Sequence, residues 1–203
     1  VDRVRDILQR DASEAQRLTP KNLSPLGFML HGGGPAQNLS KIDIVELFIQ
    51  HGADPNGTIG GQPILTVAAR TCQPGVLDAL LKGGASVATP NGDGKIALHN
   101  AATSCPANTK RLLASSAPVD WQDREGNTAL HYAAVQKDRE QVALLLAAGA
   151  NPDIKNRSLQ TPSSHWPEFF APEDKLEEAA AMEPTMAPPP PPEPAATGAS
   201  GGS

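Results

Sequence analysis

The chain of 203 residues contains no apolar run long enough to cross a membrane. Its only two cysteines, Cys72 and Cys105, are too few for a structural zinc site, which needs four ligands. Acidic residues outnumber basic ones, and the net charge is −5. Residues 171–203 contain one lysine and six acids, so this segment carries the whole net charge and the rest of the chain is neutral. A neutral body with an acidic end lacks the basic footprint that nucleic-acid binding requires.

Catalytic motifs are lacking as well. His31-Gly-Gly-Gly34 is similar to the oxyanion loop of some esterases, but the Gly-x-Ser-x-Gly elbow that accompanies such a loop is absent. Asn91-Gly-Asp-Gly94 is not followed by the Gly-Lys-Ser/Thr of a phosphate-binding loop. No nucleophile, base and oxyanion hole come together. We therefore expect no catalytic residue, no cofactor, no metal site and no enzyme activity.

The composition changes at residue 171. The segment 171–203 holds eight of the 20 prolines, and the run Pro188–Pro192 favours polyproline II. Such a segment cannot bury enough apolar surface to fold. We predict a disordered, acidic, proline-rich tail that serves as a spacer or a terminus. A docking site for an aromatic-grooved module is the alternative.

The clearest pattern lies between Asp123 and Lys155. It opens on the turn Asp123-Arg-Glu-Gly126 and continues with Thr128-Ala-Leu-His-Tyr-Ala133. Gly149 follows the second predicted helix, where a residue in a left-handed cap conformation is expected. This segment resembles one ankyrin repeat, which is a turn plus two helices in about 33 residues around T-P-L-H-x-A. Ala129 replaces the proline of that signature.

The same motif recurs upstream. Leu65, Leu98 and Leu130 occupy the same motif position, and each lies one repeat length from the next. One repeat cannot bury its own apolar face, and about three are needed for an independent solenoid. No alternating strand pattern of useful length is present. The resemblance therefore implies an all-α ankyrin-repeat solenoid of helix-turn-helix units with hairpin-like turns.

The resemblance also sets the expected boundaries. Trp166, Phe169 and Phe170 follow the last repeat, and we expect them to cap the end of the core. The insertion in the irregular repeat lies near residues 31–40. The predicted units are a partial N-terminal capping repeat (1–18), an irregular repeat (19–57), three ankyrin repeats (58–90, 91–122 and 123–155), a C-terminal cap (156–170) and the tail (171–203).

Two duplicated positions have structural readings. The resemblance implies that His99 and His131 tie successive turns together by hydrogen bonds. Cys72 and Cys105 lie one repeat length apart, in the same inter-helix loop of consecutive repeats. Stacked helices lie about 8–10 Å apart, whereas bridged cysteines need Cα atoms within about 7 Å. The sequence is therefore compatible with a disulfide between Cys72 and Cys105 and with two reduced thiols. We expect a cytoplasmic protein by default, and an extracytoplasmic or secreted one if the disulfide forms.

The resemblance implies a function in protein–protein interaction, through the concave face and the hairpin tips. We expect a monomer that binds another protein. Two alternatives are a regulatory or targeting domain of a larger enzyme or effector, and an extracytoplasmic protein stapled by Cys72 and Cys105. Trp121 has two readings, a binding anchor or a ring folded over the neighbouring turn. The residues expected on the binding surface are Gln62, Arg70, Asp93, Lys95, Asn100, Trp121, Arg124, Glu125, Asn127, Tyr132 and Gln136.

Overall fold

The computed structural model describes residues 41–170. The predicted N-terminal cap at 1–18, the insertion near 31–40 and the tail at 171–203 lie outside the described residues. Of the described residues, those at 41–169 belong to one compact unit.

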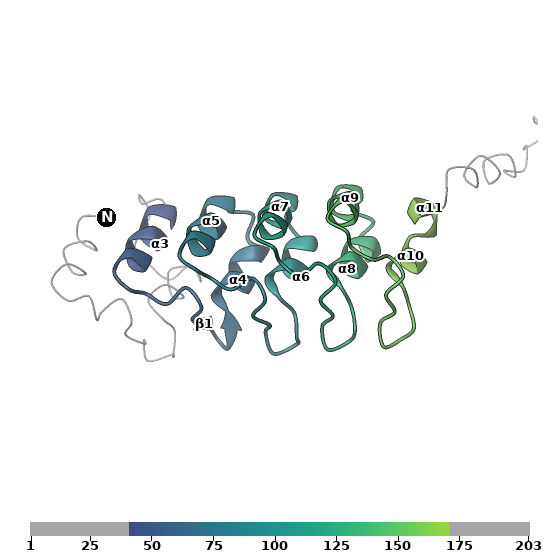
Figure 1. Ribbon diagram of the computed structural model, residues 1–203, viewed down its shortest axis with the longest axis horizontal. Coiled ribbons are helices and arrows are strands. Elements are labelled where there is room, and N and C mark those ends of the chain that lie inside the picture. The colour runs from purple at the N-terminus through teal and green to yellow at the C-terminus, as the bar shows by residue number, and fades with distance from the viewer. Residues whose placement is uncertain (1–40, 171–203) are drawn as a thin grey trace, which may run out of the picture. The chain divides into compact units, whose positions relative to one another are not determined.

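The described helices of this unit stack in two rows, and hairpin-like turns project below them (Figure 1). One row holds longer outer helices, and the other holds short inner helices. The outer row is α3 (Lys41–Gln50), α5 (Pro74–Lys82), α7 (Pro106–Ala114) and α9 (Arg139–Ala147), and the inner row is α4 (Ile64–Arg70), α6 (Ala97–Ala102), α8 (Ala129–Val135) and α10 (Pro162–His165). The remaining elements are α11 (Pro167–Phe170) and the antiparallel pair β1 (Thr58–Ile59) and β2 (Gln62–Pro63). This arrangement confirms the predicted all-α repeat fold.

The inner helices α4, α6 and α8 are short and contain alanine pairs for a packing reason. Ala101 and Ala102 in α6 are fully buried, as are Ala133 and Ala134 in α8. Small side chains allow neighbouring helices to approach closely, and leucines such as Leu98 fill the space beside them. Outer helices α5 and α7 start on proline, and α9 starts after the polar cap Asp138, which suits a helix N-terminus.

Buried polar side chains join neighbouring repeats. The hydroxyl of Thr109 donates to Oε1 of Gln141 at 2.8 Å, and Nε2 of Gln141 donates to the carbonyl oxygen of Ala101 at 2.9 Å. Both side chains are fully buried. Because an unpaired polar group is costly inside a core, these bonds favour one register of stacking.

The helix cap predicted at Gly149 is present, since Gly149 has φ 87°. Gly84 after α5 has φ 92°, so both glycines adopt the left-handed conformation that ends a helix. The corresponding position after α7 is Ser116, with φ 61°. Ser116 therefore adopts the same left-handed conformation, although it is not the glycine that favours this conformation.

Candidate partner-binding surface

Three turns below the helices share one internal hydrogen-bond pattern. They are Asn91–Lys95, Asp123–Asn127 and Asn156–Gln160. In each, Oδ1 of the first residue accepts the backbone N–H groups of the third and fifth residues, at 2.9 to 3.0 Å. The sequence folds this way because Asn and Asp carry an acceptor that mimics a backbone turn.

Backbone hydrogen bonds link these turns in series. The N–H of Arg124 donates to the carbonyl oxygen of Asp93 at 2.9 Å, and the N–H of Arg157 donates to that of Glu125 at 2.9 Å. We call the three turns and these two bonds the hairpin ladder. The ladder fixes the spacing between successive tips.

The two histidines connect the inner helices to the ladder. Nδ1 of His131 accepts the backbone N–H of Thr128 at 3.1 Å, and Nε2 lies 3.1 Å from the carbonyl oxygen of Gln160. His99 repeats this pattern one unit earlier. The geometry assigns a neutral ring with the proton on Nε2. Burial lowers the pKa of both histidines, which favours that form. The predicted structural role of both histidines is confirmed.

Trp121 folds over the preceding turn. Its indole N–H donates to the carbonyl oxygen of Gly94 at 3.0 Å, and its side chain is half-buried. The ring therefore supports the ladder, and part of the Trp121 residue stays exposed to solvent.

Lys95, Asp123 and Tyr132 form a polar cluster beside the ladder. The hydroxyl of Tyr132 donates to Oδ2 of Asp123 at 2.6 Å, and Nζ of Lys95 lies 4.5 Å from the centroid of the Tyr132 ring. Burial lowers the pKa of Lys95, but Tyr132 and the nearby carboxylates outweigh it, so the net shift is upward. Burial, followed by the hydrogen bond to Asp123, raises the pKa of Tyr132. The cluster keeps its lysine charged at neutral pH.

A groove of about 290 Å³ opens between the second and third turns, on the side of α8 and α10. It brings together the predicted Glu125, Asn127 and Tyr132. Val135 lines it as well and is 58% exposed, which is unusual for a large apolar side chain. The other lining residues are His131, Asn156, Ser158, Gln160 and His165.

Several predicted site residues lie elsewhere on the molecule. Gln62 is in β2, Arg70 ends α4 and is exposed, and Gln136 is exposed at the end of α8. Nδ2 of Asn100 donates to the carbonyl oxygen of Thr66 at 2.9 Å, so its amide is engaged inside the solenoid. Exposed Arg124 and Asp93 lie at the tips of the ladder.

The sequence did carry a signal for Val135, which was not among the predicted residues. Val135 follows Arg70 by two repeat lengths and therefore occupies the same slot at the end of an inner helix. His165 carried no such signal, because α10 lacks the repeat motif.

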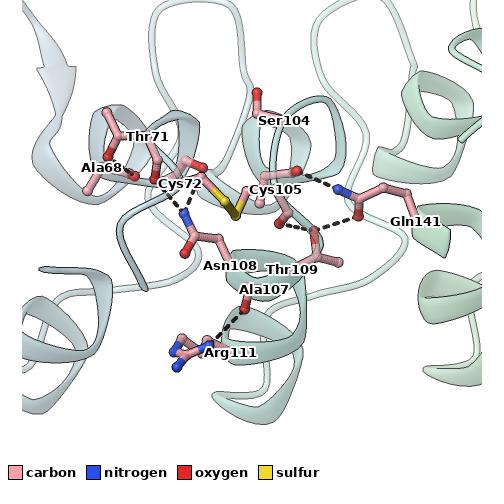
Figure 2. Close-up of a disulfide and its surroundings, with 12 residues drawn as sticks. Ala68, Thr71, Cys72, Ser104, Cys105, Ala107, Asn108, Thr109, Arg111 and Gln141 are labelled. Atoms are coloured by element: carbon pink, nitrogen blue, oxygen red, sulfur yellow. Dashed lines mark hydrogen bonds between the residues drawn. A yellow bond between two sulfur atoms is a disulfide. The ribbon is translucent and has the colours of Figure 1, made fainter. Parts of the chain in front are cut away.

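Cys72 and Cys105 are joined by a disulfide between consecutive repeats (Figure 2). Their Cα atoms are 5.4 Å apart, closer than packed helix axes, because the loop after α4 reaches toward the start of α7. Nδ2 of Asn108 donates to the carbonyl oxygens of Ala69 at 3.1 Å and Thr71 at 2.8 Å. The amide of Asn108 thus holds the same loop independently of the disulfide.

Aromatic side chains gather after the last turn. The rings of Trp166 and Phe169 stack with centroids 4.7 Å apart. Cζ of Arg139, from α9, lies 6.0 Å and 5.2 Å from the two centroids. These contacts place the pair beside the last outer helix.

Comparison with known protein families identifies the class. Residues 73–156, from the start of the α5 region to the third turn, match the family model of Ankyrin repeats (3 copies). Residues 73–156 of this chain are therefore ankyrin repeats. A search of curated proteins gave no match. Within residues 41–170, no helix is long and apolar enough to span a membrane, and no cluster of His, Cys, Asp or Glu suits a metal ion.

Proposed function

We propose that this chain is a non-enzymatic interaction module that acts as a monomer and binds a partner protein through the concave face and the hairpin tips. Ankyrin repeats generally mediate protein–protein interaction. A rigid stack of helices that presents varied side chains at regular spacing suits recognition.

The observation that carries the proposal is the groove between the second and third turns. Glu125, Asn127 and Tyr132 supply polar groups there, and Val135 supplies an exposed apolar surface. An apolar contact with polar groups around it is typical of the centre of a protein interface. The Tyr132 hydroxyl is fixed by Asp123, so the ring is already positioned and little side-chain entropy is lost on binding.

An affinity capture with purified chain tests this proposal. Val135→Asp places a charge in the groove at a side chain that is 58% exposed, so it should abolish capture of the partner. Ala143→Asp is the matched control, because Ala143 is exposed on outer helix α9. Capture that survives Val135→Asp would move the site away from the groove. The absence of any captured protein would count against the interaction function itself.

We also propose that the chain works in an oxidising compartment. The bond between Cys72 and Cys105 supports this proposal, because disulfides persist in secreted and extracytoplasmic proteins and are rare in the cytosol. The test is to alkylate the protein in its native cells before lysis and to measure its mass. Two alkylated cysteines in the native protein would overturn the proposal.

A further inference from the structure

The sequence contains four Asn-x-Ser/Thr motifs, the pattern in which an asparagine accepts an N-linked glycan in secreted proteins. They are Asn22-Leu-Ser24, Asn38-Leu-Ser40, Asn56-Gly-Thr58 and Asn156-Arg-Ser158. The first two lie outside the described residues. The other two differ in the exposure of their asparagine and in the bonds of its amide, and this difference decides which of them can carry a glycan.

Asn156 is buried, and its side chain holds the third turn of the hairpin ladder together. Oδ1 of Asn156 accepts the N–H groups of Ser158 and Gln160 at 3.0 Å, and Nδ2 donates to Oδ1 of Asn127 in the second turn at 2.8 Å. The residue is only 9% exposed. Because Nδ2 faces the second turn, a sugar on that nitrogen would separate the two turns. The fold is therefore incompatible with a glycan at Asn156.

Asn56 lies on an exposed turn that precedes β1. The N–H of Gly57 donates to the carbonyl oxygen of Asp54 at 3.2 Å, which closes a β-turn with Asn56 at its third position. Asn56 is exposed, and so is Thr58, the third residue of the motif. Both side chains that define the motif are thus accessible on one surface loop.

The amide of Asn56 can carry a sugar and keep its shorter hydrogen bond. Oδ1 accepts the N–H of Ser86 at 2.8 Å, and a glycosylated amide retains this oxygen. Nδ2 lies 3.3 Å from the carbonyl oxygen of Gly84, and this contact is long and exposed, so little stability depends on it. Among the described residues, nothing lies within 4 Å of a Cβ atom added at Gly84. The loop beside the amide therefore leaves room for a bulky group.

Resting on the oxidising compartment proposed above, we infer that Asn56 is an N-glycosylation site. Nδ2 of Asn56 forms a bond to the anomeric carbon of an oligosaccharide that is carried on a lipid diphosphate. The bond between that carbon and the diphosphate oxygen breaks, the lipid diphosphate leaves with the electron pair, and Nδ2 gives up one proton. Asn56 precedes β1, near one end of the described repeats, and α8 and α10 lie toward the other end (Figure 1). The glycan therefore leaves the groove beside α8 and α10 accessible.

The test uses the protein isolated from its native cells. Peptide N-glycosidase in heavy-oxygen water removes N-linked glycans and leaves a labelled aspartate wherever an asparagine was occupied, and peptide mapping by mass spectrometry locates the label. Digestion without the glycosidase is the control, because asparagine before glycine also deamidates spontaneously. We expect a glycosidase-dependent label at Asn56 and none at Asn156. An unlabelled Asn56 would overturn the assignment, and so would a label at Asn156, because the fold would then not distinguish the two motifs.

Two substitutions at the third position of the motif form a matched pair. Thr58→Ser keeps the hydroxyl that the motif requires, and Thr58→Ala removes it, while Asn56 and its bonds stay in place. Because Thr58 is exposed, both variants should fold with similar Tm values. Expressed in the native cells, Thr58→Ser should keep the glycan at Asn56 and Thr58→Ala should lose it. A glycan that survives Thr58→Ala would contradict recognition through this motif.

Alkylation of free cysteines in the same samples separates the glycosylation site from the compartment on which it rests. An intact disulfide between Cys72 and Cys105 with an unmodified Asn56 would leave the oxidising compartment standing and overturn the glycosylation site. Two free thiols with an unmodified Asn56 would overturn both. A glycan at Asn56 with two free thiols would support the glycosylation site and show that the disulfide is not what marks the compartment.

Discussion

Nε2 of His99 lies 3.1 Å from the carbonyl oxygen of Asn127, in the turn that follows the next outer helix. This contact joins inner helix α6 to that turn, while Nδ1 of the same ring accepts the N–H of Ile96 at 3.3 Å. A protonated ring has no acceptor, so charging His99 would break the bond to Ile96. The stack of repeats is thereby coupled to a proton equilibrium.

Stability should fall in mild acid for this reason. Burial lowers the pKa of His99 and His131 in the folded chain below the ordinary value of 6.5. Below pH 6.5 these two histidines therefore bind protons in the unfolded chain while they remain neutral in the folded chain. The free energy of unfolding decreases as the pH drops toward the pKa values of the folded state. Above pH 6.5 this contribution is complete. Urea unfolding at several values between about pH 5 and pH 8 measures it.

A substitution isolates the histidine contribution. His131→Gln should lower the free energy of unfolding near neutral pH, because Gln reproduces the bonds to Thr128 and Gln160 imperfectly. It should also flatten the dependence on pH, since one titrating group is gone. An unchanged slope would show that other groups cause the acid sensitivity.

The core should respond strongly to loss of a leucine. Leu145 in α9 is fully buried, so Leu145→Ala leaves a cavity and should cost about 2–5 kcal/mol in the free energy of unfolding. Val135→Ala is the control, because Val135 is 58% exposed and its truncation opens no cavity. Chemical denaturation of both variants checks the difference. Equal losses would contradict the packing described for α9.

Loss of the disulfide should weaken the fold without abolishing it. The bond links two cysteines at a sequence separation of 33, and removal of such a link typically costs about 2–4 kcal/mol. The bonds from Asn108 to Ala69 and Thr71 remain, so the loop should keep its place. A Cys72→Ser/Cys105→Ser variant should have the circular dichroism of the parent and a lower Tm. Two titratable thiols in unreduced, denatured parent protein would contradict the bond itself.

The repeat architecture was predictable because its signal is periodic. The regular spacing of Leu65, Leu98 and Leu130 predicts stacked units, and Gly149 predicts where a helix ends. Ser116 was not predictable in the same way. It takes a left-handed conformation because the stack imposes it, and its own side chain gives no sign of that.

The candidate site was predictable only in part. Repeat position places Glu125, Asn127 and Tyr132 on the same surface, and the groove contains all three. The Trp121 ring turns toward the carbonyl oxygen of Gly94 in the neighbouring turn. This contact depends on how the repeats stack and cannot be read from the local sequence. The disulfide depends in the same way on how far one loop bends.

Two glycines of similar φ should differ in their tolerance of alanine. Gly126 has φ 78° and Gly149 has φ 87°, so alanine at either position costs about 1–2 kcal/mol through the left-handed backbone alone. At Gly149 nothing lies within 4 Å of an added Cβ atom, whereas at Gly126 the nitrogen of Arg157 and Cα of Asn156 both lie at 3.0 Å.

The neighbours of Gly126 are backbone atoms of the next turn, which cannot rotate away as a flexible side chain would. Gly126→Ala must therefore displace the third turn or break its bond to Glu125, and it should lower the free energy of unfolding by more than Gly149→Ala does. Urea unfolding of both variants gives the comparison. Amide exchange at Arg157 reports directly on whether its N–H still bonds to the carbonyl oxygen of Glu125. Equal losses with Arg157 still protected would mean that the turns are less tightly stacked than the hairpin ladder requires.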